Sequence, residues 1–202
     1  MLKERNLLSK FDEIQVGDNS LQLYRDGNEL APAMLAAIDE ANECIYLEAS
    51  LWRDDETGRA FTEHLSRRAA QGVEVYVMCG NWRQPKGSSA FGSFLAGVHR
   101  LETMPFRRPW HVLDPRRYVP DHRTLLVVDG VNGFIGGFQS GLPYRNTVLD
   151  THLRLRGSAT ADIAYAFIER WNRFSSPREQ ITRRYRRILI LTSIFRPMTR
   201  YD

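Results

Sequence analysis

The hydrophobic positions of the chain fall into short apolar runs that alternate with amphipathic stretches. A buried strand is a continuous apolar run of roughly four to eight residues, whereas a surface helix repeats its apolar residues about every 3.6 positions. Strands are therefore expected at 21–24, 44–51, 73–79, 98–104, 124–128, 131–137 and 149–156, and helices at 29–42, 59–71, 88–96 and 158–174. This alternation predicts an α/β fold in which a mixed β-sheet is flanked by helices on both faces.

Two features of the pattern make the prediction more specific. The strand, helix, strand unit at 44–79 should have parallel strands, with Cys44 and Cys79 at opposite ends, about 20 Å apart and too far to bridge. At 149–156 apolar and polar residues alternate, so His152, Arg154 and Arg156 share the face opposite the leucines of a half-buried strand. Unpaired cysteines favour a reducing compartment, and we expect a cytoplasmic protein.

Helix starts are predicted from residues that can accept a hydrogen bond from the first turn. Asn28 and Ser158 precede the first and last predicted helices, so each is a candidate cap, whereas 54–58 is expected to be a loop. The 202 residues should form one domain over 21–176, between a polar lead at 1–20 and a basic, apolar tail at 177–202. The tail is either a basic helix that lies on a partner or an anionic membrane, or the arbitrary end of a truncated or frame-shifted product.

Composition and charge allow partners that carry phosphate. The hydrophobic fraction of 43% and the charged fraction of 26% are those of an ordinary globular protein, and the formal net charge is +4. Arg107, Arg108, Arg116 and Arg117 would form a basic rim, although a solvated loop with incidental arginines explains them equally well. No apolar stretch suits a signal peptide or a membrane span, so membrane contact would be peripheral, on the inner face.

Candidate chemistry gathers around the central strand predicted at 124–128. Because side chains alternate along a strand, His122 and Thr124 should point the same way. Asp129 and Gly130 form a turn into the next strand, which ends at a pair of glycines where the backbone can approach a ligand closely. The groups that would form an anion pocket there are Gly136, Gly137, Gln139 and Ser140.

This segment resembles the phospholipase D superfamily, whose signature is HxKxxxxD followed by GGxN or GSxN. His122 and Asp129 stand at the required interval, but Thr124 occupies the lysine position and Gln139 the asparagine position. The segments IYLEASLWRDDETGRAF, LLVVDGVNGFIGG, LDTHLRLRGSAT and AFIERW are similar to the amino-terminal half of cardiolipin synthase-type members. The resemblance covers about 21–171 and implies the α/β/α sandwich of that superfamily.

The resemblance also implies a two-step transfer through a phosphohistidine. His122 would be the nucleophile, Asp150 would orient its imidazole, and Asp129 would be a structural anchor for the hairpin. The phosphate contacts would be Thr124, Gly137 and Gln139, of which threonine offers only a neutral hydroxyl where lysine supplies a charge. A second histidine, from another such motif, would protonate the leaving alcohol, and no metal or other cofactor is needed.

Several functions stay open at this point. The first is a phosphatidyltransferase or phosphodiesterase related to cardiolipin synthase, impaired by the missing lysine and completed by a homodimer mate or a second HKD-bearing half. The alternative is a degenerate or truncated relative that binds a phosphodiester, a membrane surface or a homologous partner, and a weaker alternative is a nuclease with one motif. The remaining histidines show no metal-ligand spacing, so no zinc site is expected among His64, His99, His111 and His152.

Overall fold

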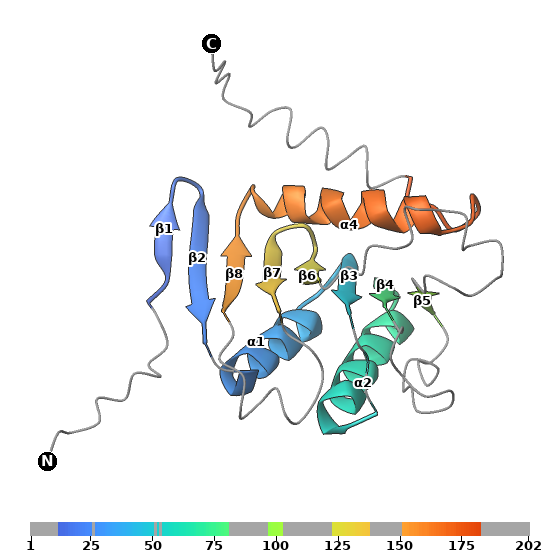
Figure 1. Cartoon of the computed structure of the whole chain (residues 1–202), viewed down its shortest axis with the longest axis horizontal. Helices are drawn as coiled ribbons and strands as arrows, with labels where there is room; N and C mark the ends of the chain where they lie inside the picture. Colours follow the sequence, from blue (N-terminus) through green and yellow to red (C-terminus); the bar gives the residue numbers. More distant parts are fainter. Residues whose placement is uncertain are drawn as a thin grey trace, which may run out of the picture.

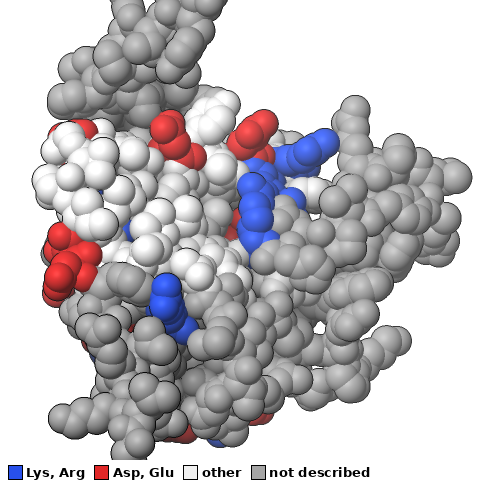
Figure 2. All heavy atoms as spheres, turned by 60° about the vertical axis from the view of Figure 1, so that its left-hand side comes forward, with Lys and Arg blue, Asp and Glu red and all other residues white. Residues whose placement is uncertain are grey.

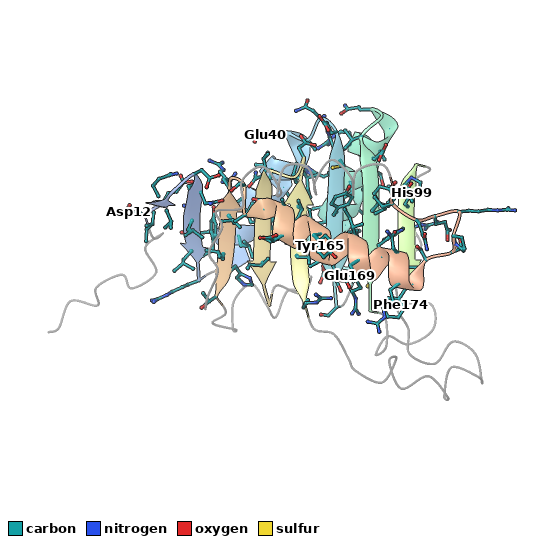
Figure 3. The ribbon with its side chains drawn as sticks, turned by 90° about the horizontal axis from the view of Figure 1, so that it is seen from above. Asp12, Glu40, His99, Tyr165, Glu169 and Phe174 are labelled. Atoms are coloured by element: carbon teal, nitrogen blue, oxygen red, sulfur yellow. The ribbon has the colours of Figure 1, made fainter. Side chains whose placement is uncertain are left out.

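In the computed structural model the residues described are 12–25, 27–50, 52, 54–80, 97–102, 123–137 and 151–182. They form an eight-stranded mixed sheet with α4 on one face and with α1 and α2 on the other, as Figures 1 and 3 show. The predicted α/β class with helices on both faces is confirmed. The strands are β1 Ile14–Val16, β2 Asn19–Tyr24, β3 Cys44–Ala49, β4 Glu74–Cys79, β5 Val98–Glu102, β6 Thr124–Val128, β7 Asn132–Gly136 and β8 His152–Arg156, and the helices are α1 Gly27–Asp39, α2 Glu56–Ala70 and α4 Thr160–Phe174.

The strand order is β1-β2-β8-β7-β6-β3-β4-β5, in which β3, β4 and β5 are mutually parallel and the other pairs are antiparallel. All five residues of β6 are buried, as its apolar sequence predicts for a central strand. The parallel β3–β4 register pairs Cys44 with Glu74 and Ala49 with Cys79. The two cysteines are therefore at opposite ends of the pair and form no disulfide, as predicted, and both are buried.

Side-chain alternation divides the core into two layers. Leu126 and Val128 point toward α1 and α2, where Met34, Ile38 and Leu65 supply the helix side of the layer. Leu125 and Val127 point the other way and pack under α4 with Tyr46, Phe167, Ile168 and Trp171. The apolar faces of the amphipathic helices α1, α2 and α4 thus face the sheet.

The first two helices begin earlier than predicted. The α1 helix starts at Gly27, so Asn28 lies inside its first turn, a shift within the usual uncertainty of helix ends. The α2 helix starts at Glu56, inside the predicted loop, because the Asp55 side chain accepts a hydrogen bond of 2.9 Å from the backbone N–H of Gly58.

The cap predicted for the last helix is wrong. Ala159 occupies the N-cap position of α4 and no side chain caps the helix. The backbone N–H of Ala159 instead donates to Oδ1 of Asn19 at 2.8 Å, and Asn19 begins β2 far away in sequence. A residue distant in sequence therefore accepts a backbone N–H at the start of α4, which was the role predicted for Ser158. The local sequence does not indicate such a contact.

Two described segments outside the predicted domain of 21–176 contact it. The short strand β1 lies within the predicted lead and pairs with β2. Ile181 lies within the predicted tail, is 4% exposed, and packs in the α4 layer, where its N–H donates to Asn172 Oδ1 at 2.8 Å. The predicted helix at 88–96 and the segment 183–202 fall outside the described residues. Among the helices that are described, none combines the length and the apolar character needed to cross a membrane.

Candidate functional site

Several neighbouring strands begin or end along one side of the sheet, at the lower ends of the strands in Figure 1, and this side is called the lower edge below. There the register pairs Tyr24 with His152 and Thr124 with Gly136. The β7–β8 register, continued by one residue, places Gly136 opposite His152, and the β3–β6 register continued likewise places Thr124 opposite Ala49. Residues in one such row share a face, and Tyr24 and Ala49 belong to the layer under α1 and α2. The row therefore presents Thr124 and His152 on the same face of the sheet.

Gly136 is the position that brings these two side chains together. A Cβ atom on Gly136 would meet Cγ of His152 and the carbonyl oxygen of Thr151 at 3.0 Å each, and would come closer still to His152 Nδ1. The imidazole therefore occupies the space in which any other residue at 136 would carry its side chain. A glycine that sequence analysis assigned to ligand approach is also required for packing of a histidine.

A small hollow lies between this row and α1. Its wall contains two side chains with polar groups, Thr124 and His152, which are 5% and 4% exposed. The other lining residues are apolar or glycine: Leu30, Met34, Phe134, Ile135 and Gly136. A hydrogen bond or a charge in such a setting acts more strongly than it would in water.

The predicted phosphate contacts Thr124 and Gly137 both lie at this edge, because Thr124 begins β6 and Gly137 directly follows β7. His122, Gln139, Ser140 and Asp150 are outside the described residues. In sequence they lie within a few residues of the described ends of β6, β7 and β8. Their convergence on one pocket and the hydrogen bond between His122 and Asp150 therefore stay predictions.

Asp129 lies at the other end of β6, about 16 Å from Thr124 at 3.3 Å per residue. Its carboxylate accepts hydrogen bonds from the backbone N–H groups of Asn42 at 2.8 Å, Glu43 at 2.8 Å and Cys44 at 2.9 Å. It adopts a φ of 53° in the turn between β6 and β7. The side chain thus joins this turn to the start of β3 and is remote from the strand ends that carry Thr124.

Sequence analysis did not assign His152 to the site. The alternation at 149–156 is present, but the face opposite the leucines is covered by α1, so His152 is buried where a polar face was expected. The signal that could have found it is the pairing of a histidine with a glycine on the neighbouring strand, since the ring fills the place of the absent side chain.

A buried ion pair supports the opposite face of the same edge. Arg170 Nε on α4 lies 2.9 Å from Glu48 Oε1 on β3, and the two side chains are 19% and 5% exposed. The guanidinium also lies 5.3 Å from the ring centroid of Phe174. Glu48 precedes Ala49, the residue of β3 that belongs to the row described above. The pair therefore holds α4 against the end of β3.

Two of the histidines outside the HKD-like segment, His64 and His99, contact other side chains. His64 Nδ1 lies 2.8 Å from Asp39, whereas His99 stacks on Tyr76 with ring centroids 4.5 Å apart, near the β5 edge in Figure 3. Although burial opposes ionisation of Asp39, hydrogen bonds from Arg67 and His64 hold the pKa of its carboxyl below the ordinary value. Within the described ranges no three histidine, cysteine or acidic side chains group as a metal site would require.

Figure 2 turns the β1–β2 side of the molecule forward and shows small groups of acidic and basic side chains around a wide uncharged area. Large apolar side chains on the outer strands are exposed, including Ile14 at 60% and Val16 at 54%. The predicted rim at 107–117 is outside the described residues.

Comparison with known proteins gives relatives of one kind, although no family model matches the chain. It is 32% identical over 165 residues to the cardiolipin synthase of Staphylococcus aureus (strain Mu50), an alignment that covers 77% of this chain and 33% of that protein. It is 31% identical over 167 residues to the major cardiolipin synthase of Bacillus subtilis (strain 168), with 78% and 34% covered. The chain therefore spans about one third of the length of these relatives.

Solved structures share the fold at low identity. The phospholipase D family member Nuc from Salmonella typhimurium matches with a TM-score of 0.57 and 17% identity, over 76% of this chain and 95% of Nuc. Phosphatidylserine synthase from Haemophilus influenzae matches with a TM-score of 0.60 and 14% identity, over 91% of this chain and 45% of the synthase. With the similarity to cardiolipin synthases, this common fold identifies the chain as a member of the phospholipase D superfamily.

Proposed function

We propose that this chain forms one half of a phospholipase D-type catalytic centre that transfers a phosphatidyl group, related to the cardiolipin synthases. The observation that carries the proposal is the row at the strand ends, where Thr124 and Gly136 of the HKD-like segment line a common hollow with His152. Similarity to cardiolipin synthases over 77% of the chain supports a phospholipid as the substrate. Contact with a membrane would then be peripheral, at its inner face.

The proposed reaction balances without a redox step or a cofactor. The imidazole of His122 attacks phosphorus, so that a P–N bond forms while the P–O bond to the leaving alcohol breaks. A second histidine donates a proton to the departing oxygen and then takes one from the incoming alcohol, which breaks the P–N bond and frees His122. Asp150 would hold the imidazole in the reactive tautomer, with Gly137 and Gln139 beside the phosphate oxygens.

The 202 residues carry one HKD-like motif, so the proposed reaction needs a second histidine from another such motif. A second copy of the chain, or another protein half with its own HKD motif, would supply it. Activity then depends on assembly of two parts, and adding a partner separates the two sources. A homodimer is active without an added partner, and its activity rises with the concentration of the chain, whereas a missing half must be provided.

Thr124 is the feature that limits the proposed activity. Losing a charged contact that stabilises the transition state commonly costs about 100-fold or more in rate. A chain with a neutral hydroxyl at this position should therefore transfer slowly, and Thr124→Lys should raise the rate by about 10- to 100-fold.

The test is a transfer assay on vesicles that contain phosphatidylglycerol, with wild type, Thr124→Lys and Thr124→Lys/His122→Ala, each alone and mixed with an intact cardiolipin synthase as the second half. We expect the highest rate from Thr124→Lys and none above the partner's own rate from the His122→Ala variant. Transfer by this chain that survives His122→Ala would contradict the proposal.

A second candidate function is favoured by the same neutral residue. A site that keeps its glycines and hydroxyl but lacks the lysine can bind a phosphodiester without turning it over. In that case vesicle binding would persist in His122→Ala and Thr124→Lys would add no turnover with any partner. A nuclease remains the weaker alternative, supported only by the net charge of +4 and the single HKD-like motif.

A further inference from the structure

The face of the sheet that carries α4 is only partly covered by this helix. The helix contacts β7, β6 and β3. Its first turn lies over the upper end of β7, where a Cβ atom on Gly133 would meet side-chain atoms of Thr160 at 3.0 Å and Ile163 at 3.1 Å. From there α4 runs toward β5, so that β1 and β2 lie beyond its start, as Figures 1 and 3 show.

Aliphatic side chains occupy the part of this face that α4 leaves uncovered. The register pairs Leu23 with Leu153 and Leu153 with Ile135, and it pairs Ile135 with Leu125, which packs under α4. Side-chain alternation and the β1–β2 register place further members on the same face. We call this set the outer face, and its members are Ile14, Val16, Leu21, Leu23, Ile135 and Leu153.

Burial of polar and apolar side chains is reversed along β2 and β8. An antiparallel sheet that is solvated on one face usually turns its polar residues to that face. Here Gln22 and His152 are 7% and 4% exposed on the side of α1, whereas Leu23 belongs to the outer face and is 36% exposed. Ile135 on β7 is 38% exposed. A contiguous apolar area of this kind is typical of a surface that another apolar surface covers.

The chemistry of the outer face suits a second copy of the chain. All six members are uncharged, so two identical outer faces meet without repulsion between like charges. Permanent homodimers have the more apolar interfaces, and a two-fold dimer uses the same patch on both copies. A sheet face packs against another protein layer about 10 Å away, whereas segments that lie on membranes are typically amphipathic helices with a basic polar side.

The outer face also adjoins the proposed half-site. The row formed by Leu23, Leu153 and Ile135 lies next to the row that contains Thr124 at the lower edge. A two-fold axis parallel to the strands turns one outer face onto the other and leaves both lower edges at the same end of the pair. The HKD-like segments of the two copies would then lie across from each other.

On the basis of the proposed half-site, we propose that the outer face binds the outer face of a second copy of this chain. The histidine that the reaction needs from another motif then comes from an identical chain. The contact depends on aliphatic side chains of β1, β2, β8 and β7, so the dimer forms whether or not the site turns over a substrate. Assembly and activity are therefore measured separately.

The experiment is sedimentation equilibrium of the full chain over a range of concentrations, which measures the dimer without an activity assay. The test variant is Leu23→Glu/Ile135→Glu, in which both replaced side chains are partly exposed. The matched control is Val131→Glu, which replaces an apolar side chain that is 60% exposed in the turn between β6 and β7, at the other end of the sheet. Urea unfolding shows that each variant is folded.

We expect a dimer for wild type and Val131→Glu. The dissociation constant of the dimer should rise by about 100-fold or more in the double variant, because a two-fold interface buries each new carboxylate in both copies. A monomeric wild type, or a double variant that dimerises as tightly as wild type, would overturn the proposal. A monomeric wild type whose binding to phosphatidylglycerol vesicles is lost in the double variant would assign the outer face to lipid instead.

A second measurement covers the case in which the double variant does not fold. In wild type, the methyl NMR signals of Leu23 and Ile135 should shift as dilution separates the dimer, while those of Val131 stay constant. Shifts confined to residues outside the outer face would contradict the proposal. A dimer with these properties that transfers no phosphatidyl group with any partner would support the interface and contradict the proposed function.

Discussion

At the scale of single residues, Asp129 and Gly136 in the HKD-like segment each have a structural role that the motif itself does not state. Asp129 accepts three backbone N–H groups of the chain entering β3, at the end of β6 that lies away from Thr124. Gly136 leaves space for the imidazole of His152. Both roles concern the positioning of strands, and the contribution of each to stability can be measured without an activity assay.

Replacing Asp129 by alanine should destabilise the domain by about 2 to 4 kcal/mol, because three hydrogen bonds to a charged acceptor are lost and the turn must hold alanine in the left-handed region, at positive φ. Asp129→Asn keeps one acceptor oxygen and tolerates that φ, so its cost should be clearly smaller. Urea unfolding measures both. Equal losses for the two variants would show that the hydrogen bonds do not stabilise the turn.

The packing of His152 over Gly136 predicts a coupled pair. Gly136→Ala should destabilise the domain, since the new methyl group meets the ring and the Thr151 carbonyl oxygen. In a His152→Ala background the ring is gone, so the cost of Gly136→Ala should fall, and the remainder reports the clash with the carbonyl. A double-mutant cycle from urea unfolding gives the coupling. Additive effects would mean that the ring does not fill the space above Gly136.

At the scale of the elements, the strands were largely predictable and the helix starts were not. The runs at 44–51, 73–79 and 124–128 became β3, β4 and β6, because a strand buried on both faces is apolar at most positions, with Glu48 in β3 and Thr124 in β6 as polar exceptions. The start of α4 depends on Asn19, which is remote in sequence, so no local pattern could place it. The burial of His152 likewise depends on α1 covering its face of the sheet.

The contact between α4 and β3 depends on the pair formed by Arg170 and Glu48. Arg170→Met should destabilise the domain by about 3 kcal/mol, because it removes the guanidinium that lies 2.9 Å from the buried Glu48 carboxylate. Glu48→Gln in the same background removes that charge and should recover part of the loss. The free energy of unfolding in urea measures both steps. A single variant within about 1 kcal/mol of wild type would show that the pair contributes little.

The contact between α1 and α2 should depend on pH through Asp39. Its folded pKa lies below the unfolded value of about 3.8, so the stability it contributes is present in full above that value and is lost as the pH falls through the lower folded pKa. The side chain is 42% exposed, and solvent screening keeps the contribution within about 1 kcal/mol. Unfolding of wild type and Asp39→Asn should therefore differ more at pH 7 than at pH 3. A difference that grows in acid would contradict this assignment.

At the scale of the whole molecule, the chain has the fold of the superfamily but spans about one third of its cardiolipin synthase relatives. One sheet, covered on both faces, brings the ends of β2, β6, β7 and β8 to a common edge, and the HKD-like residues lie at or next to those ends in sequence. The proposed chemistry needs two histidines, so we propose that this edge forms one half of the catalytic centre.

In the proposed mechanism His122 carries the phosphatidyl group. The most direct measurement is mass spectrometry of the Thr124→Lys protein after brief reaction with phosphatidylglycerol and an intact synthase, with an alkaline quench that preserves phosphohistidine. Trypsin releases residues 118–123 as one peptide whose single histidine is His122. We predict a phosphatidyl adduct on this peptide that disappears with His122→Ala. An adduct on any other peptide of this chain, or transfer by this chain without an adduct at His122, would contradict the account.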